Sequence, residues 1–567
     1  MTERSRITGS PRSLALAGLL AGATALLAAP EPAEAFCGFY VAGADAKLFN
    51  DATVVVLMRD GTRTVLSMQN AYQGPPEDFA LVIPVPVVLR EGDVKTLRAE
   101  LFDRVDQLAA PRLVEYWEHD PCTEDEVWGG LGLTGTGRGG GGAGYGGIGL
   151  GNLQTVKVEA QFDVAEYEIV ILSATESTGL DSWLRDNDYN IPAGAEPLLR
   201  PYVQQDMKFF VAKVDRNKVK FDAKGRAMLS PLRFHYESKE FALPVRLGLI
   251  NAPDPSSGGK QDLLVHILAP GTRYQTANYE NVTIPTNLDL QASAKDQFGE
   301  FYVSLFDHTL AQHPKAVVTE YAWAAGSCDP CPATPLTSKE LLELGGDVLP
   351  KWSSKLANDE GDGGIGFGGS GPSREFVLTR LHARYDASSL GEDLVFEAAP
   401  AIVGGRERIL DAQGQLEQGS RPAEGEANNF QARYAIRHPW TGAIACEQPV
   451  RGRWSGPPPE GELRTEPTLA RQLTQVARGG SLGSFVTAGA GTQLGVTVIE
   501  APPPGPKSAP VQPPPEPTPA SREPAEAEPA AASKGCTCEA NAPSSTGFTS
   551  LLGLLALLGL RRRKSPS

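Results

Sequence analysis

The chain has 567 residues, with 52 Lys and Arg, 68 Asp and Glu, and 41% hydrophobic residues. This composition supports a sizeable folded core and excludes a chain that is disordered throughout. The formal net charge of −16 would repel phosphate backbones, which bind proteins through Lys and Arg, so we expect no nucleic-acid partner. The 61 Gly and 46 Pro indicate low-complexity inserts within a globular chain.

Residues 1–35 have the layout of a cleaved secretory signal peptide. A basic start precedes an apolar stretch over 14–29, and a small-residue cleavage site ends at Ala35. Cleavage there would leave Phe36 as the mature N-terminus. A lipoprotein signal at Cys37 is the alternative, but the residues before this cysteine are charged or bulky where that signal needs small ones.

The body, residues 36–500, is followed by a segment dominated by Pro, Ala and Glu over 501–535. This composition predicts a disordered, Pro-rich stalk that favours extended polyproline conformations. An apolar stretch over 544–560 comes next, and its 17 residues are at the lower limit for a short transmembrane segment. The basic cluster 561–564 behind it would stay on the cytoplasmic side.

The motif Gly535-Cys536-Thr537-Cys538, the leucine-rich span and the terminal RRRK resemble the MYXO-CTERM sorting domain of bacterial surface proteins. The resemblance covers residues 535–564. It implies export, cleavage by a C-terminal sorting protease, lipid attachment at Cys536 or alternatively Cys538, and display at the cell surface on the outer membrane. The alternative is an ordinary C-terminal membrane anchor with two incidental cysteines.

Strand patterns outnumber helix patterns in the body, so we expect an α+β fold with a β-rich body, antiparallel sheets and a few helices. An Asp60-Gly61 turn predicts a hairpin over 53–69. Further strands are expected at 79–90, 164–173, 208–215, 242–251, 262–269, 316–323, 376–386 and 393–398. Helices are expected at 94–108, 179–187, 194–205, 294–312 and 337–345.

Two glycine-rich stretches, 129–151 and 361–371, predict loops or flexible inserts, because glycine loses much backbone entropy in a regular element. Three other segments, 77–86, 239–249 and 391–400, share an acidic turn followed by a strand. They hint at a repeated unit, although such a short pattern also arises by chance.

Distinctive motifs run through the body, among them FCGFYVAGADAKLFN, FALVIPVP, WLRDNDYNIP, YVQQDMKFFVAKV, CDPCP and RHPWTG. With these motifs the chain resembles the bacterial envelope proteins grouped as domain of unknown function 2330, over nearly all of 36–455. The resemblance brings no established activity, substrate or catalytic residue.

Five cysteines lie in the body, and an exported chain would meet an oxidising compartment. The disulfide candidates are Cys37, Cys122, Cys328, Cys331 and Cys446. We expect two disulfides and one remaining thiol, with no connectivity deducible from the sequence.

The pair Cys328 and Cys331 has the C-x-x-C spacing of thiol oxidoreductases. A redox site of that kind sits at the start of a helix, whereas Pro332 and Pro335 delay any helix here until about Ser338. Structural disulfides are therefore the main interpretation and redox exchange the alternative. We expect no metal site, because no second C-x-x-C or histidine pair completes a ligand set.

Other motifs point to no reaction. Ser481 lies in a G-x-S-x-G match, but an α/β-hydrolase needs a histidine after the serine and none follows His438. We therefore expect no cofactor and favour display over turnover. The predicted function is a surface-displayed envelope protein, a binding or structural module tethered by a processed C-terminal anchor, whose surface ligand the sequence does not identify. The alternative is an envelope thiol-disulfide oxidoreductase using Cys328 and Cys331.

Overall fold

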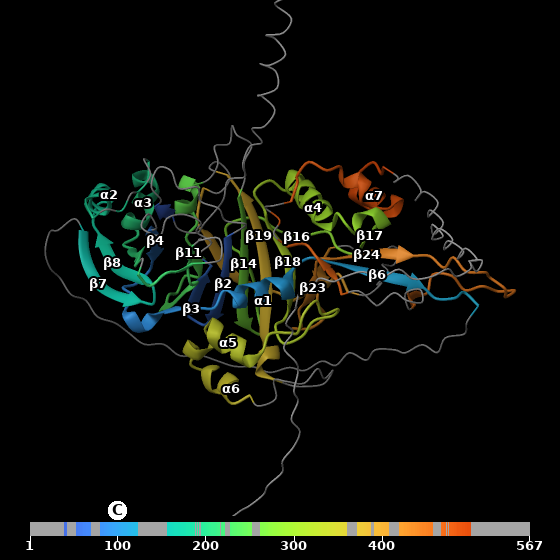
Figure 1. Cartoon of the computed structure of the whole chain (residues 1–567), viewed down its shortest axis with the longest axis horizontal. Coiled ribbons are helices and arrows are strands. Elements are labelled where there is room, and N and C mark those ends of the chain that lie inside the picture. The colour runs from blue at the N-terminus through green and yellow to red at the C-terminus, as the bar shows by residue number, and fades with distance from the viewer. Residues whose placement is uncertain are drawn as a thin grey trace, which may run out of the picture. The chain divides into compact units, whose positions relative to one another are not determined.

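The computed structural model describes residues 39–41, 53–69, 80–122, 156–187, 189, 191, 194–215, 217–221, 227–251, 261–359, 371–386, 391–406, 419–456, 466–471, 473 and 476–499. Internal contacts separate the chain into two units, Met1–Pro502 and Pro503–Ser567. Every described residue belongs to the first unit, and Figure 1 labels its main elements.

The largest sheet has eleven strands among the described residues, in the order β22-β21-β23-β18-β19-β14-β2-β3-β12-β5, with β16 beside β18. The strands are β2 (Thr53–Asp60), β3 (Arg63–Met68), β5 (Val94–Thr96), β12 (Leu232–Glu237), β14 (Gln261–Pro270), β16 (Asn281–Thr283), β18 (Val317–Ala324), β19 (Phe376–Tyr385), β21 (Ile402–Gly404), β22 (Arg421–Pro422) and β23 (Asn429–Gln431). The central strands β18, β19 and β14 lie side by side (Figure 1). Nearly every residue of β14 is buried, so both faces of the sheet are covered there.

A second, antiparallel sheet has the order β1-β4-β9-β8-β7. Its strands are β1 (Phe39–Val41), β4 (Ala80–Val85), β7 (Val156–Val164), β8 (Tyr167–Ala174) and β9 (Lys208–Val214). One face packs on the large sheet, where Ile169 and Phe210 meet Val265 in a shared apolar core. The other face, with Leu172 and Phe209, packs against α2 (Ser177–Asp186) and α3 (Glu196–Gln204).

The remaining strands of the described residues form three further sheets. The first consists of β17 (Leu288–Leu290), β24 (Arg433–His438), β6 (Arg112–Glu118), β25 (Trp454–Gly456) and β26 (Thr468–Leu469). The second consists of β13 (Ala242–Leu243), β20 (Leu394–Ala399) and β15 (Arg273–Thr276). The third pairs β10 (Lys220–Phe221) with β11 (Ala227–Met228). Parallel pairs such as β2 with β14 and β6 with β24 accompany the antiparallel ones. They join strands far apart in the sequence, which no local pattern could predict.

Helices cover the face of the large sheet that lies opposite the second sheet. The remaining helices are α1 (Glu100–Ala109), α4 (Phe298–Gln312), α5 (Ser338–Leu344), α6 (Ser353–Ala357) and α7 (Ala488–Leu494), with 3-10 turns at η2 (Glu91–Asp93), η3 (Arg246–Asn251), η5 (Ala292–Ala294), η6 (Gly346–Val348), η7 (Pro372–Glu375) and η9 (Leu482–Ser484). Helices α1, α5 and α6 enclose one apolar core, which includes Phe102, Leu341 and Leu378. Helices α4 and α7 enclose another apolar core, which includes Phe301 and Tyr434.

The expected α+β, β-rich body with antiparallel sheets and a few helices is confirmed. The hairpin at 53–69 forms as β2 and β3. Helix α5 begins at Ser338, where Thr337 and Glu340 form a reciprocal capping box. These elements carry strong local patterns, which explains why sequence reasoning finds them.

Two expected elements need correction. The range 94–108 is not one helix, because β5 pairs with β12 before α1 begins. The range 242–251 is not one strand, because Pro244 cannot donate to a strand ladder and η3 follows β13. The strand expected at 164–173 forms as β8, which begins at Tyr167, and the strand β7 that pairs with it was not predicted.

Several predicted segments lie outside the described residues. They are the signal peptide 1–35, the glycine-rich stretch 129–151, the stretch 361–371 except its last residue, the stalk 501–535, and the tail 535–564 with its apolar span 544–560 and basic cluster 561–564. Within the part of the chain that is described, none of the helices is long and apolar enough to cross a membrane.

Replacement of Gly405 by alanine will destabilise the fold. Gly405 follows β21 with φ +63°, and an added Cβ would lie 1.9 Å from the carbonyl oxygen of Gln431. Gly271 has the same φ with open space around it, so Gly271→Ala is the matched control. We expect the control to lose about 1–2 kcal/mol from the left-handed backbone alone, and Gly405→Ala to lose a further 1–3 kcal/mol or so from the close contact. Urea unfolding measures both; equal losses would contradict this packing.

Candidate functional site

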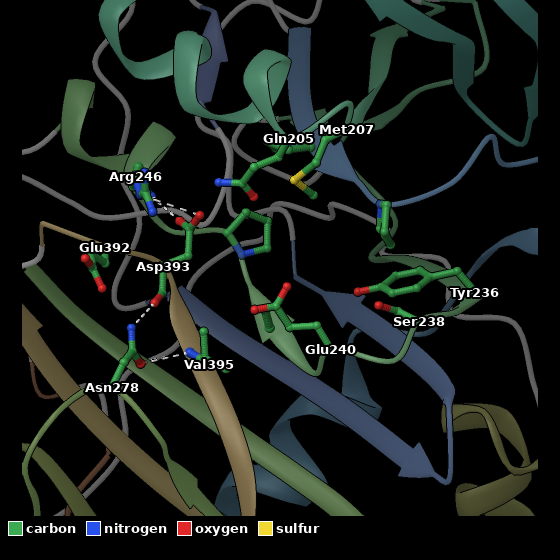
Figure 2. Close-up of a pocket in the computed structure, with 14 residues that line it drawn as sticks. Gln205, Met207, Tyr236, Ser238, Glu240, Arg246, Asn278, Glu392, Asp393 and Val395 are labelled. Carbon is green, nitrogen blue, oxygen red and sulfur yellow. Dashed lines mark hydrogen bonds and ion pairs between the residues drawn. The ribbon is translucent and has the colours of Figure 1, made fainter.

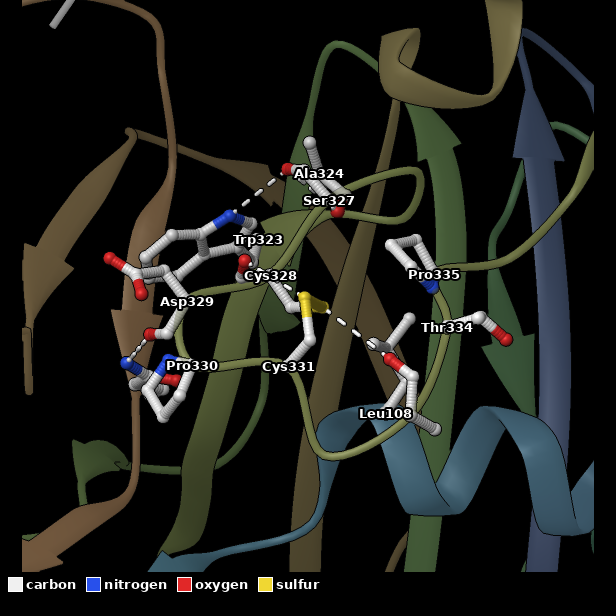
Figure 3. The surroundings of a disulfide bond; sticks show 12 residues. Leu108, Trp323, Ala324, Ser327, Cys328, Asp329, Pro330, Cys331, Thr334 and Pro335 are labelled. Atoms are coloured by element: carbon white, nitrogen blue, oxygen red, sulfur yellow. Dashed lines mark hydrogen bonds between the residues drawn. A yellow bond between two sulfur atoms is a disulfide. The ribbon is translucent and has the colours of Figure 1, made fainter. Parts of the chain in front are cut away.

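Cys328 and Cys331 are bonded to each other in the loop that follows β18. Figure 3 shows the disulfide between Trp323 of β18 and Leu108 of α1. Cys331 is exposed, whereas Cys328 is half-buried and packs against the apolar core of α1 and α5. One sulfur of the pair therefore faces solvent and the other faces the protein interior.

Two buried side chains from distant strands hold the backbone between these cysteines. Nη1 of Arg112, on β6, donates to the carbonyl oxygen of Pro330 at 2.8 Å. Nε2 of Gln431, on β23, donates to the carbonyl oxygen of Asp329 at 2.6 Å. The loop is thus positioned by the core. The next helix in the chain, α5, begins only at Ser338, so Cys331 does not lie at its N-terminus.

The second disulfide joins Cys122 to Cys446 over a sequence separation of 324 residues. Cys122 follows β6 and Cys446 follows β24, and these two strands pair in parallel up to Trp117 and His438. The bond therefore ties together the segments that leave the ends of two neighbouring strands. The two disulfides among the described residues match the number expected from the sequence. Cys37, the fifth cysteine of the body, lies outside the described residues.

A fully buried ion-pair network occupies the centre of the large sheet. Glu320 of β18 has no exposed surface and accepts from Nε of Arg380 and Nδ1 of His382, each at 2.6 Å. The hydroxyl of Tyr302, on α4, also donates to Glu320. Arg380 continues the network to Asp106 of α1, with Nη1 and Oδ1 2.6 Å apart. The network thus connects two helices, α1 through Asp106 and α4 through Tyr302, to the middle strands.

The network extends from the core to partly exposed arginines. Nε2 of His382 lies 3.1 Å from Oδ1 of Asp262, on β14, and Nη2 of Arg478 lies 2.5 Å from Oδ2 of the same carboxylate. Nε of Arg471 lies 2.9 Å from Oδ2 of Asp106. Every carboxylate at the centre therefore faces at least one cation, which is the condition for burying charge.

His382 is held in its charged form. Burial lowers the pKa of its imidazole, but the charge of Glu320 and the hydrogen bond with Asp262 outweigh burial and raise the pKa to about 9. Phe306 of α4 stacks on the ring at 3.8 Å between centroids. Because both ring nitrogens already face carboxylates, the imidazole has no free nitrogen with which to accept a proton from a substrate. This cluster is structural.

His266, unlike His382, is held in its neutral form. Burial and the neighbouring Arg380 lower the pKa of His266 to about 4, so its ring is neutral near pH 7. Both His266 and His382 are completely buried in the sheet, although scattered histidines were expected to be solvated or locally bonded. Within the described residues no group of three His, Cys, Asp or Glu side chains is placed to hold a metal ion.

A polar pocket of about 290 Å³ lies beside the second sheet. We call it the β12–β20 pocket, because residues of and around β12, β13 and β20 form most of its lining. Its lining residues are Pro84, Pro86, Gln205, Met207, Tyr236, Ser238, Glu240, Ala242, Pro244, Arg246, Asn278, Glu392, Asp393 and Val395 (Figure 2). Segments from five separate regions of the chain meet here.

Asp393 fixes one wall of this pocket. Its Oδ1 accepts from the hydroxyl of Tyr202 at 2.7 Å and from the backbone N–H of Val245 at 2.8 Å. Its Oδ2 lies 3.6 Å from Nε of Arg246. Asn278 binds the backbone at the start of β20 at two points: its Nδ2 donates to the carbonyl oxygen of Asp393, and its Oδ1 accepts from the N–H of Val395. The wall is therefore preorganised by interactions within the protein.

Sequence reasoning missed this pocket, although one pattern pointed toward it. The three segments that share an acidic turn and a strand, 77–86, 239–249 and 391–400, each contribute residues to its lining. The sequence alone could not show that they converge, because β4 and β13 belong to different sheets. The remaining predicted site residues Ala35, Phe36, Cys536 and Cys538 lie outside the described residues.

The fold and these sites define a disulfide-bonded, β-rich protein with an ion-paired core. The chain belongs to a family described as an uncharacterized protein conserved in bacteria (DUF2330), whose profile matches residues 31–397. The profile match ends at residue 397, whereas the motifs suggested a resemblance that extends to residue 455. No curated protein sequence matches the chain.

Two solved structures of a mutated baculovirus P35 after caspase cleavage are similar to part of the chain. They share 11% and 13% sequence identity with it, cover 40% of this chain in each case, and are themselves covered over 70% and 67% of their length. The TM-score is 0.21 for both, and at this value the similarity supports no inference about fold or function.

The charge on His382 gives a pH-dependent contribution to stability. Its folded pKa of about 9 lies above its ordinary value of 6.5, so the stabilisation is complete below pH 6.5 and is lost as pH rises to 9. We expect the free energy of unfolding to fall by about 3 kcal/mol across this window from this group. NMR titration of the imidazole, assigned with His382→Gln, checks it; a midpoint at or below pH 6.5 would show that the ring is not held charged.

Proposed function

We propose that the chain is an exported binding or structural module that is displayed at the cell surface and tethered through its C-terminus. Support comes from the signal-like residues 1–35, the stalk 501–535 and the sorting-like tail 535–564. Family membership fits an uncharacterised bacterial protein. The proposed partners are the export machinery, a C-terminal sorting protease and the outer membrane.

The disulfide between Cys122 and Cys446 carries the export part of this proposal. Such a bond persists in oxidising compartments and is rare in the cytosol, where thiols are kept reduced. It joins segments that are 324 residues apart in the sequence and that leave the ends of the paired strands β6 and β24. A long-range structural disulfide of this kind favours folding outside the cytoplasm.

Deletion of 535–567 will release the protein from cells into the medium, because the proposed anchor is lost. Cys536→Ser should have the same effect if the lipid is attached there, and Cys538→Ser is its matched control. Protease accessibility on intact cells and mass spectrometry of the mature C-terminus measure display and processing. Unchanged surface presentation after the deletion would contradict C-terminal anchoring.

A second candidate function is thiol-disulfide exchange at Cys328 and Cys331. It is favoured because these cysteines are bonded to each other and Cys331 is exposed. In the reduced protein, the Cys331 thiolate would attack a substrate disulfide and expel one substrate thiolate. The Cys328 thiolate would then attack Cys331, expelling the second and restoring the bond. A dithiol must supply the two electrons for each further turnover.

This candidate makes a direct enzymatic prediction. If it holds, the purified protein will accelerate reduction of insulin disulfides by dithiothreitol, and Cys328→Ser will abolish the acceleration because the mixed disulfide cannot resolve. The paired change Cys122→Ser and Cys446→Ser, which removes the other disulfide, is the control and should retain it. Equal insulin reduction by the wild-type protein and Cys328→Ser would end the redox candidate.

A further inference from the structure

The β12–β20 pocket contains acidic groups that the protein itself does not neutralise. Glu240 and Glu392 line it, and neither carboxylate forms a hydrogen bond or an ion pair with any described residue. Arg246 is the one lining cation, and Asp393 already faces it at 3.6 Å. Both glutamates are exposed, and together they give the lining side chains a net negative charge, which favours a cation in the pocket. Arg59, which donates to the backbone carbonyl of Ser238 at 2.9 Å, offsets part of this charge.

Tyr236 supplies an independent indication of a ligand. Its side chain comes from β12, the residue is only 7% exposed, and its hydroxyl has no hydrogen-bond partner among the described residues. Figure 2 shows this hydroxyl pointing toward the pocket, beside Ser238 and Glu240. The hydroxyl oxygen opens into the pocket and is not enclosed by protein, so a ligand that donates a hydrogen bond here would replace water as its partner.

Burial raises the pKa of Tyr236 far above its ordinary value. The hydroxyl therefore stays neutral at physiological pH, with its oxygen lone pairs available as acceptors. An ammonium group donates up to three hydrogen bonds and accepts none, which matches a carboxylate and a phenolic oxygen side by side. A phosphate or carboxylate ligand would instead face two like charges.

The rest of the lining is suited to a hydrocarbon chain. Pro84, Pro86 and Pro244 present rigid apolar rings, and Met207 adds a flexible apolar side chain. A ligand with charged ends and a methylene stem would bury its stem against these residues and direct its ends to the carboxylates. The volume of about 290 Å³ admits a small molecule of this type.

We propose that the β12–β20 pocket binds a short linear diamine, with one ammonium group between Glu240 and Tyr236 and the other at Glu392. This inference deepens the proposed binding role and assigns its ligand class. The ion-paired Asp393 shapes the wall and does not bind the ligand directly, since its oxygens already accept from Tyr202, Val245 and Arg246.

Isothermal titration calorimetry of the full-length purified protein with 1,5-diaminopentane tests the proposal. We expect saturable binding that weakens with added salt, and no binding of the uncharged 1,5-pentanediol. The double variant Glu240→Gln with Glu392→Gln should weaken diamine binding at least tenfold. Tyr236→Phe, which removes only the hydroxyl, should weaken it several-fold.

A second double variant, Glu237→Gln with Glu397→Gln, is the matched control. Both residues are exposed, lie on β12 and β20 outside the pocket lining, and their replacement changes the net charge by the same amount. Wild-type affinity in this control supports a defined site. Equal weakening in both double variants, equal binding of pentanediol, or no saturable binding by wild-type protein would overturn the proposal. Surface display is measured separately on cells, so its failure and the failure of diamine binding are distinguishable.

Discussion

Glu320 has no exposed surface in the middle of the largest sheet, and it can be charged there only because Arg380 and His382 face it. Glu320 is also the extra residue of a β-bulge: Thr319 and Tyr321 pair with consecutive residues of β19, which leaves Glu320 between them. A slip of β18 by one residue would turn this carboxylate to the opposite, apolar face. An unpaired buried charge costs several kcal/mol, so the network fixes the register of the central strands.

The same network determines how the helices dock. Along β19, Leu381 and Ala383 face the apolar core shared with the second sheet, while Arg380 and His382 point to the helical face. Asp106 brings α1 to this face, and Tyr302 and Phe306 bring α4. Purely apolar contacts would tolerate sliding of these helices, whereas a buried charge must stay beside the groups that neutralise it. The network therefore contributes specificity to the packing, beyond whatever it adds to stability.

Sequence reasoning succeeded where the determinants are local. The hairpin over 53–69 follows from a turn between two β-rich runs, and the start of α5 near Ser338 follows from the prolines before it. It could not find the ion-pair network, because charged residues within a strand pattern are normally solvent-exposed. Asp106 and Arg380 are 274 positions apart, and their pairing depends on strand order, which no spacing encodes. The pocket was missed for the same reason, although three of the segments that line it share a visible pattern.

The two disulfides differ in what they contribute to the fold. Cys328 and Cys331 are three residues apart, and Arg112 and Gln431 hold the backbone between them by hydrogen bonds that do not involve the sulfur atoms. Closing so short a loop removes little entropy from the unfolded chain, and the folded loop keeps its anchors in either thiol state. The bond between Cys122 and Cys446 closes a loop a hundred times longer. Stabilisation by cross-linking therefore rests mainly on the long-range disulfide, and the short one can be opened without releasing its loop from the core.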